Sequence, residues 1–173
     1  MKKIYVFKKI DSGIQGKAFE MAIKDALKRK NPDCVSSCGK ADFRYYHKNY
    51  DTKQNGSVLQ YNPNDKYIKG SNRVIYATHI DYSIEWEQGD EIGISVDLLN
   101  TQMFVVDKTE FVEFLLENGK AKQNLSRGTV NIQTCYNYKK NAYHGKTGKL
   151  IEAWAYENEI DDDIIDHIIE GLI

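Results

Sequence analysis

The apolar residues of this chain change their spacing several times, and this change constrains the fold more than any other feature. Over residues 15–30 they recur every three or four positions, which is typical of one buried face of a helix. Over residues 42–46, 50–54 and 73–80 they form short runs rich in aromatic and β-branched side chains, which predict strands. Similar patterns predict further strands at 92–98, 103–106 and 129–138 and further helices at 109–116, 150–157 and 163–172. The mixture of helices and strands indicates an α/β or α+β fold.

The length of the chain indicates a single domain over residues 1–173. No apolar run reaches the roughly 20 residues of a membrane span, and the first residues are too few and too charged for a signal peptide. We therefore expect a cytoplasmic protein with no membrane partner. The three cysteines, Cys34, Cys38 and Cys135, are too few for a disulfide framework and lack the second ligand pair of a zinc site.

The net charge of −1 hides an uneven distribution of charged residues. Residues 1–53 contain 13 Lys and Arg against 6 Asp and Glu, whereas the rest of the chain contains 11 against 19. A basic first third is able to attract phosphate groups, because the local field steers a polyanion more than the total charge does. The alternative is a solvated basic helix followed by an acidic end with a separate role.

Residues 42–54 bring several charged side chains together if they form the predicted hairpin. With a two-residue turn at His47 and Lys48, position 42 pairs with 53 and position 44 with 51. Because side chains alternate along a strand, Asp42, Asp51 and Lys53 then share one face of the hairpin. A three-residue turn would change this register and weaken the arrangement.

Glu20 flanks the apolar stripe of the preceding helix, so we expect its carboxylate to lean toward the same sheet. Two or three converging carboxylates suit a hard divalent cation, and Mg²⁺ in particular binds through few carboxylates and keeps several waters. Beside such an ion a lysine orients or helps to deprotonate water, and the ion stabilises the charge on an attacked phosphate. Phosphodiester hydrolysis requires this chemistry. The simpler alternative is a charged hairpin face on an unrelated α/β protein.

Glu20 in a helix, Asp42 on one strand and Asp51-Thr52-Lys53 on the next follow an ordered pattern. In these residues the chain resembles the PD-(D/E)XK nuclease superfamily, which includes restriction endonucleases, Holliday-junction resolvases and phage exonucleases. The resemblance covers about residues 13–80. It implies a restriction-endonuclease-like core, in which helices flank a mixed central sheet. The C-terminal part is then expected to elaborate this core or to form a dimer interface.

The resemblance also implies a role for each of these residues. Asp42 and Asp51 would be metal ligands, joined by the backbone carbonyl of Thr52. Lys53 would be the water-activating lysine and Glu20 an accessory acid. The implied cofactor is Mg²⁺, with Mn²⁺ expected to substitute, and no organic cofactor is implied.

The sequence therefore predicts a Mg²⁺-dependent DNA endonuclease, of a structure-selective or resolvase-like kind. Lys17, Lys40 and Arg44 are the predicted contacts to DNA phosphates. Cutting both strands with one site per chain requires a homodimer, and the helix at 109–116 or the C-terminal helix is expected to supply its apolar face. In the C-terminal region this face consists of Ile160, Ile164, Ile165, Ile168, Ile169 and Leu172.

Two other functions are compatible with the same residues. The first is a catalytically inactive nuclease fold that binds DNA or a protein partner, for example in a phage or plasmid setting. The second is an interaction module whose acidic C-terminal half binds a basic partner, so that the charges of the hairpin are incidental.

Overall fold

The computed structural model describes most of the chain. The backbone is described for residues 2–39, 41–54, 58–61, 72–118, 121–124, 129–133, 136–137, 142–143 and 145–173. The side chains are described for residues 2–39, 41–54, 72–118 and 148–173.

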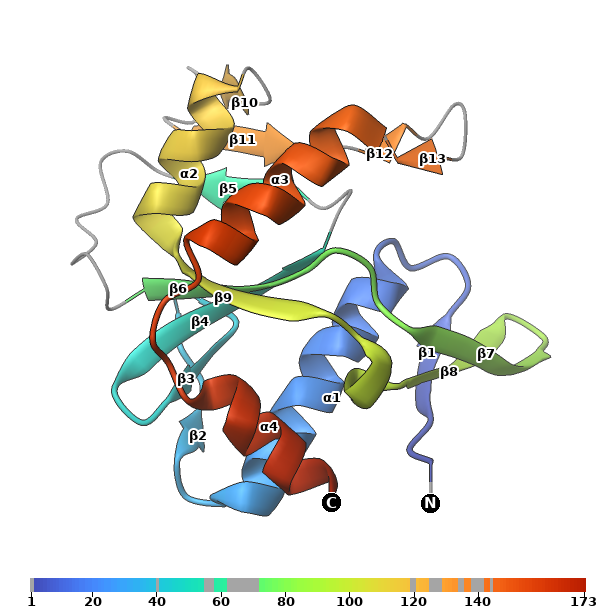
Figure 1. Ribbon diagram of the computed structural model, residues 1–173. Coiled ribbons are helices and arrows are strands. Elements are labelled where there is room, and N and C mark those ends of the chain that lie inside the picture. Colours follow the sequence, from blue (N-terminus) through green and yellow to red (C-terminus); the bar gives the residue numbers. More distant parts are fainter. Residues whose placement is uncertain are drawn as a thin grey trace.

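A mixed sheet of five strands forms the centre of the molecule (Figure 1). In spatial order its strands are β2 (Val35–Ser36), β3 (Phe43–Tyr45), β4 (Lys48–Gln54), β6 (Asn72–Ala77) and β9 (Met103–Asp107). Strands β4 and β6 are parallel, whereas every other neighbouring pair in this sheet is antiparallel. The strand that carries Asp51 and Lys53 therefore lies in the middle of the sheet, with a neighbour on each side.

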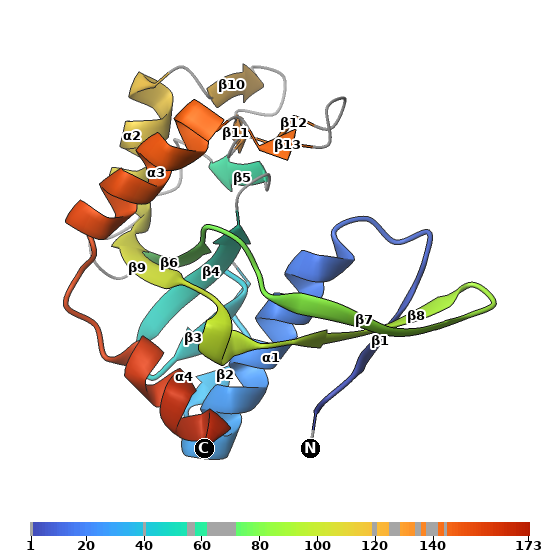
Figure 2. The same cartoon turned by 45° about the vertical axis from the view of Figure 1, so that its right-hand side comes forward.

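Three smaller sheets surround the central one. A three-stranded sheet contains β1 (Tyr5–Lys8), β8 (Glu91–Val96) and β7 (Tyr82–Gln88) in that order. A second contains β10 (Ala121–Asn124), β11 (Thr129–Gln133) and β5 (Val58–Tyr61), and β12 (Tyr136–Asn137) pairs with β13 (Ala142–Tyr143). The hairpin of β7 and β8 projects away from the helices (Figure 2).

The described residues form four α-helices, and these cover the central sheet from both faces (Figure 1). They are α1 (Ile14–Lys30), α2 (Lys108–Glu117), α3 (Gly145–Glu157) and α4 (Ile164–Leu172). Helices α1 and α4 pack on one face, and α2 and α3 pack on the other. The fold is thus mixed α and β, as predicted from the apolar pattern. None of the described helices has the length and apolar character needed to cross a membrane.

Alternation along the strands divides the core into two layers. Ile75 and Val105 point toward α1 and α4, whereas Val74, Tyr76 and Val106 point toward α2 and α3. Both sheet faces are therefore buried, which explains why β6 and β9 are almost continuously apolar in sequence.

Helix α2 begins as the sequence predicts. The Asp107 carboxylate accepts a hydrogen bond from the Glu110 backbone N–H at 3.0 Å, which caps the first turn. Helix α3 begins five residues earlier than the helix predicted over 150–157, at Gly145. Ile151 and Ala155 are buried in the core and fix the later turns of α3. Because adding residues to an existing helical turn costs little, the helix extends from these turns back to Gly145.

The C-terminal helix does not supply the predicted dimer face. Ile164 and Ile168 are fully buried in the core against α1, and Ile160, Ile165 and Leu172 pack around them. The apolar face of α2 is likewise buried within the chain. The amphipathic pattern of these helices therefore marks a buried face, and the surface that buries it belongs to the same chain.

Helices α1 and α4 lie in close contact at Gly171. A Cβ atom at this position would lie 1.9 Å from the backbone oxygen of Ala26. Two polar contacts flank the same place: Arg29 Nε donates to the Gly171 carbonyl oxygen at 2.7 Å, and Lys30 pairs with Glu170 at 2.8 Å. The docking of α4 therefore depends on the absence of a side chain at position 171.

We expect Gly171→Ala to lower the free energy of unfolding by about 1–3 kcal/mol, because the added methyl group overlaps the backbone of α1. Gly16→Ala is the matched control, since a Cβ there would lie 3.9 Å from Gln54 Nε2, the nearest atom outside its own helix. Alanine in a helix is favoured over glycine by about 0.5–1 kcal/mol, so the control should gain stability. Urea unfolding measures both effects, and equal midpoints for the two variants would contradict the close contact.

Candidate functional site

The hairpin of β3 and β4 has a different register from the predicted one. Phe43 pairs with Tyr50 and Arg44 with Asn49, so the turn consists of Tyr46 and His47. The predicted pairing of 42 with 53 and 44 with 51 is therefore wrong by two residues. A shift of two preserves the alternation of side chains, so Arg44, Asp51 and Lys53 still share a face.

That face is the one covered by α2 and α3. Asp51 pairs with Val74 and Lys53 with Tyr76 across the parallel ladder, and both partners belong to the core layer under these helices. Thr52 pairs with Ile75 and faces α1 instead. The side chains of the Asp51-Thr52-Lys53 segment thus reach both sides of the sheet.

Asp42 lies just before β3, at the point where the ladder to β4 ends. Its carboxylate Oδ2 accepts hydrogen bonds from the Thr52 backbone N–H at 2.8 Å and from Thr52 Oγ1 at 3.1 Å. Asp42 therefore satisfies a backbone donor of β4 that β3 no longer reaches. This bonding brings the Asp42 carboxylate to the face covered by α1, so it does not share a face with Asp51 as predicted.

Glu20 joins Asp42 from helix α1. The pKa of Glu20 is raised to about 7, first by burial and then by the negative charge of Asp42, a hydrogen bond between the two carboxyl groups and the charge of Asp51. At neutral pH without a cation the Glu20 carboxyl therefore keeps its proton for a large part of the time. We call Glu20, Asp42 and Asp51 the carboxyl cluster; the sequence predicted its members, and the structure brings them into electrostatic contact.

Asp51 has a partner that the sequence did not reveal. Lys108 Nζ lies 2.7 Å from Asp51 Oδ2, and the two side chains are only 5% and 11% exposed. Lys108 is the first residue of α2, so the cap at Asp107 fixes where its side chain begins. The helix predicted at 109–116 locates this segment, but no spacing in the sequence links Lys108 to Asp51.

The remaining predicted residues lie around the cluster. Lys53 is half-buried two positions after Asp51 on the same face of β4. Gln54 follows it, and its side-chain amide lies beside Gly16 near the start of α1. The first turns of α1 therefore pack against the end of β4, which places Glu20 next to Asp42. The role predicted for the Thr52 carbonyl stays a prediction.

The predicted DNA contacts lie in different surroundings. Lys17 is exposed on the first turn of α1, and Arg44 is exposed on β3, where its Nε donates to Asn49 Oδ1 at 3.0 Å. Lys40 lies outside the described residues. Two exposed basic residues therefore lie on elements that carry Glu20 and Asp42.

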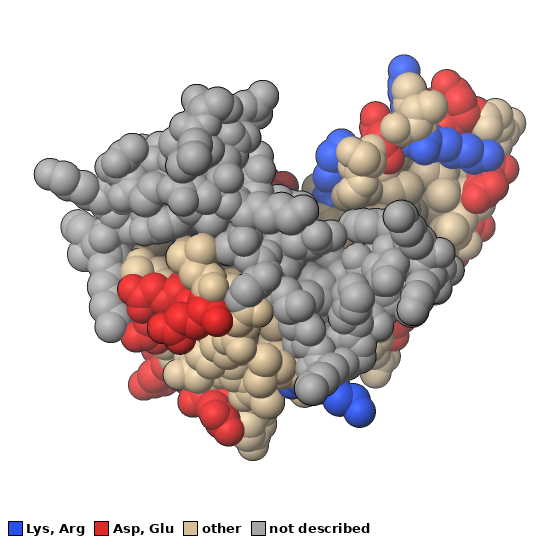
Figure 3. Space-filling view, turned by 90° about the horizontal axis from the view of Figure 1, so that it is seen from above, with Lys and Arg blue, Asp and Glu red and all other residues tan. Residues whose placement is uncertain are grey.

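Many other basic residues of the first third pair with acidic residues of the same chain. These pairs are Lys2 with Glu85, Lys3 with Asp25, Lys9 with Glu87 and Lys30 with Glu170. Seen from above, the described Lys and Arg side chains on the projecting sheet of β1, β7 and β8 alternate with Asp and Glu (Figure 3). The charge difference between the two parts of the sequence is thus partly cancelled by these contacts.

The carboxyl cluster offers only oxygen donors, which suit a hard cation such as Mg²⁺. Within the described part of the chain, however, no three His, Cys, Asp or Glu side chains gather closely enough to hold a metal ion as they stand. Asp42 and Asp51 reach opposite faces of β4, and Asp51 Oδ2 is in addition turned toward the Lys108 ammonium group.

No protein-family model matches the chain, and searches of curated proteins and of solved structures also found no match. The resemblance to PD-(D/E)XK nucleases therefore stays a prediction based on the residues of the chain itself.

The raised pKa of Glu20 predicts how stability depends on pH in the metal-free protein. The folded state holds the Glu20 proton up to about pH 7, whereas the unfolded state releases it near 4.5, so ionisation destabilises the fold as pH rises through this interval. We expect Glu20→Gln to raise Tm above pH 7 by about 2–4 °C, the shift that roughly 1 kcal/mol produces in a domain of this size. At pH 4.5 the parent and Glu20→Gln should unfold at similar temperatures, because Glu20 is then uncharged in the folded parent.

Thermal unfolding in EDTA between pH 4.5 and 8 measures this effect. Glu113→Gln, at an exposed position of α2, removes the same charge away from the cluster and serves as the control. Equal Tm values for Glu20→Gln and the parent at every pH would show that the fold does not raise the pKa of Glu20.

The buried ion pair makes a second prediction. Lys108→Met leaves the Asp51 carboxylate buried without its partner, so we expect a loss of about 3–5 kcal/mol in the free energy of unfolding. Adding Asp51→Asn removes the stranded charge and should recover most of this loss. Urea unfolding of the parent, both single variants and the double variant gives a double-mutant cycle, which measures the interaction energy of Lys108 and Asp51. Strictly additive effects would mean that the two groups do not interact.

Proposed function

We propose that the protein is a metal-dependent nuclease that hydrolyses phosphodiester bonds of DNA. The observation that carries the proposal is the carboxyl cluster with Lys53 beside it on β4. Asp42 and Asp51 both act electrostatically on Glu20, which keeps a proton because of its burial and the negative charge of Asp42. A divalent cation would supply a compensating charge, since clustered carboxylates and hard cations attract each other.

The order of the elements supports the same proposal. Glu20 lies in a helix, Asp42 directly precedes the strand β3 and Asp51-Thr52-Lys53 lies on the next strand, which is central in a mixed sheet flanked by helices. We propose that this order of elements corresponds to a restriction-endonuclease-like core. The proposed core therefore comprises α1 and the strands β2, β3, β4 and β6.

Asp42 and Asp51 would hold the ion, with the Thr52 carbonyl as a further ligand. When bound, Mg²⁺ supplies a positive charge that stabilises the negative charge of the attacked phosphate. Lys53 would orient the attacking water and Glu20 would assist as an accessory acid. Hydrolysis forms a bond between the water oxygen and phosphorus and breaks the bond from phosphorus to one sugar oxygen, which leaves with a proton. Lys17 and Arg44 would bind neighbouring phosphates.

The test is cleavage of labelled linear duplex, single strand, flap and four-way junction in Mg²⁺, Mn²⁺ or EDTA. We expect cutting that needs the metal and falls by about 100-fold or more in Lys53→Ala and in Asp42→Asn, because each removes a group that acts on the reacting atoms. Lys28→Ala, at an exposed position in the last turn of α1, is the matched control and should cut like the parent.

A parent protein that cuts none of the four substrates in either metal would refute the nuclease proposal. Cutting that survives both site substitutions would show that the activity does not come from this site. The substrate that is cut fastest distinguishes a resolvase-like enzyme from a flap or duplex nuclease. Light scattering of the protein with that substrate then tests the proposed homodimer.

One observation favours a second candidate, an inactive nuclease fold that binds DNA or a protein partner. The Lys108 ammonium already neutralises Asp51, which is the task of the metal ion in the first proposal. In this case the parent should bind DNA in EDTA without cutting it in Mg²⁺, and Asp42→Asn should bind as tightly as the parent.

A further inference from the structure

A cavity of about 300 Å³ lies between the turn of the β3–β4 hairpin and the start of α4. It is lined by Tyr45, Tyr46, Lys48, Tyr50, Asp163 and His167, and we call it the aromatic pocket. The carboxyl cluster does not use any of these residues. The volume is at the lower end of the range for small-ligand sites, about 300–1,000 Å³, so it suits one ring system.

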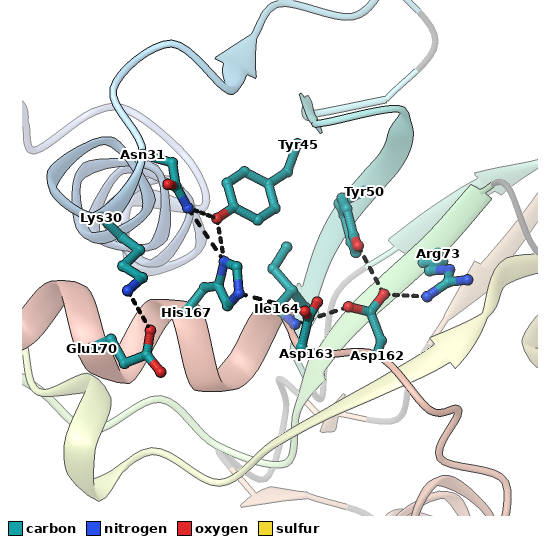
Figure 4. Close-up of polar contacts among 10 residues, drawn as sticks. All are labelled: Lys30, Asn31, Tyr45, Tyr50, Arg73, Asp162, Asp163, Ile164, His167 and Glu170. Carbon is teal, nitrogen blue, oxygen red and sulfur yellow. Dashed lines mark hydrogen bonds and ion pairs between the residues drawn. The ribbon is translucent and has the colours of Figure 1, made fainter.

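One wall of the aromatic pocket is fixed by hydrogen bonds among side chains from three elements (Figure 4). The Tyr45 hydroxyl accepts from Asn31 Nδ2 at 2.6 Å and contacts Nδ1 of His167. On the other side of its ring, His167 Nε2 lies 3.4 Å from Asp163 Oδ2. The Asp163 side chain is 74% exposed, so this pair faces the opening of the pocket.

The deeper wall is fixed in a similar way. Tyr50 is fully buried, and its hydroxyl donates to Asp162 Oδ2 at 2.8 Å (Figure 4). The same carboxylate oxygen contacts Arg73, and Asp162 Oδ1 accepts from the Ile164 backbone N–H at 2.8 Å. The walls are therefore formed before any ligand binds, which lowers the entropy lost on binding.

Tyr46 is the exposed aromatic residue of the pocket. It has a φ of 54°, a left-handed conformation that is unfavourable for a bulky residue, and its side chain remains 48% exposed. Its ring meets the Tyr45 ring edge-on, with centroids 4.7 Å apart at 77°. A hydrogen bond to Cys34 and partial burial raise the pKa of the Tyr46 hydroxyl to about 12, so the phenol stays neutral at physiological pH. The backbone strain thus presents a rigid, uncharged ring face at the surface.

The Tyr45–His167–Asp163 chain resembles an activated nucleophile but does not have its properties. Tyr45 is buried, and this burial raises the pKa of its hydroxyl above the ordinary value. A nucleophile requires an accessible oxygen that ionises easily. The three residues therefore form a wall of a binding site and do not act on a reacting bond.

We propose that the aromatic pocket binds a single unpaired nucleobase of a nucleic-acid strand. The base would stack on Tyr46, a contact that every base can make. The Asp163–His167 pair would meet its polar edge, and Lys48 would face the phosphate next to it. The identification of the ligand as nucleic acid rests on the proposed function.

The charge of the lining favours a base over the other common occupant of aromatic pockets, a quaternary ammonium group. Such cations bind in cages whose aromatic faces surround them. Here Lys48 adds a positive charge to the lining, and Tyr45 and Tyr50 are almost completely buried. The accessible surfaces are thus one ring face, one carboxylate, one imidazole and one ammonium group.

The proposal is tested by the binding of a fluorescent single-stranded oligonucleotide and of the matching blunt duplex to the full chain in EDTA. We expect Tyr46→Ala to weaken single-strand binding about tenfold, the loss of one stacked base. Tyr46→Phe keeps the ring and should bind like the parent, and duplex binding should not change in either variant. Tyr82→Ala, which removes a tyrosine that is 40% exposed on the distant strand β7, is the matched control.

A second measurement changes the oligonucleotide, so its comparison of abasic and intact strands on the parent protein does not depend on the folding of a variant. In a series of oligonucleotides, a single abasic position is placed at each point of the strand in turn. The parent should bind an abasic strand less tightly than the intact strand, whereas Tyr46→Ala should bind the two equally. Loss of single-strand and duplex binding to the same extent in Tyr46→Ala, or no loss in either, would overturn the proposal. Absence of any single-strand binding by the parent would also overturn it. Because EDTA prevents metal-dependent cutting, these results are independent of the cleavage test.

Discussion

A strand that is covered on both faces holds charged side chains only where each charge is compensated, and β4 is such a strand. On one face the Lys108 ammonium compensates Asp51 at 2.7 Å. On the other face Asp42 accepts from the Thr52 backbone, and Glu20 reduces the repulsion by keeping its proton up to about pH 7. Each of these contacts ties a different element to β4, namely α2, the start of β3 and α1. The positions of those elements therefore depend on the polar residues of β4 as well as on the apolar core.

The acidic end of the chain has a related internal role. Asp162 accepts from the Tyr50 hydroxyl and from the first turn of α4, and it also contacts Arg73. One carboxylate thus joins β4, β6 and α4, and the Lys30–Glu170 pair joins α4 to α1. Part of the charge difference between the two ends of the sequence is therefore a set of contacts within one fold, which is why that difference does not by itself identify a partner.

The sequence predicted the helices α1, α2 and α4 and the central strands β3, β4, β6 and β9, because their apolar spacing reflects faces that are truly buried. It also predicted that Asp51 and Lys53 share a face of β4, since alternation along one strand does not depend on the register. It placed Asp42 on that face as well, whereas the hydrogen bonds from Thr52 hold the Asp42 carboxylate on the other face. What it could not predict depends on contacts between distant segments. Nothing in the spacing of Lys108 shows that its ammonium group reaches Asp51, and the apolar stripe of α4 does not say whether its own chain or a second copy covers it. The short strand β1 was missed because its pattern is too brief to indicate a strand.

The position of β4 also links the two proposed sites. Lys48 lies at the start of the strand, in the aromatic pocket, and Thr52, which is hydrogen-bonded to Asp42 of the carboxyl cluster, follows four residues later on the same face. Four residues of extended strand span about 13 Å, which is the length of about four stacked nucleotides at 3.4 Å each. Because β4 is hydrogen-bonded on both sides, this separation is fixed. A strand held by one base in the pocket would have its phosphates restricted to a short distance around the cluster, so binding energy gained on Tyr46 would serve to position the bond to be cut.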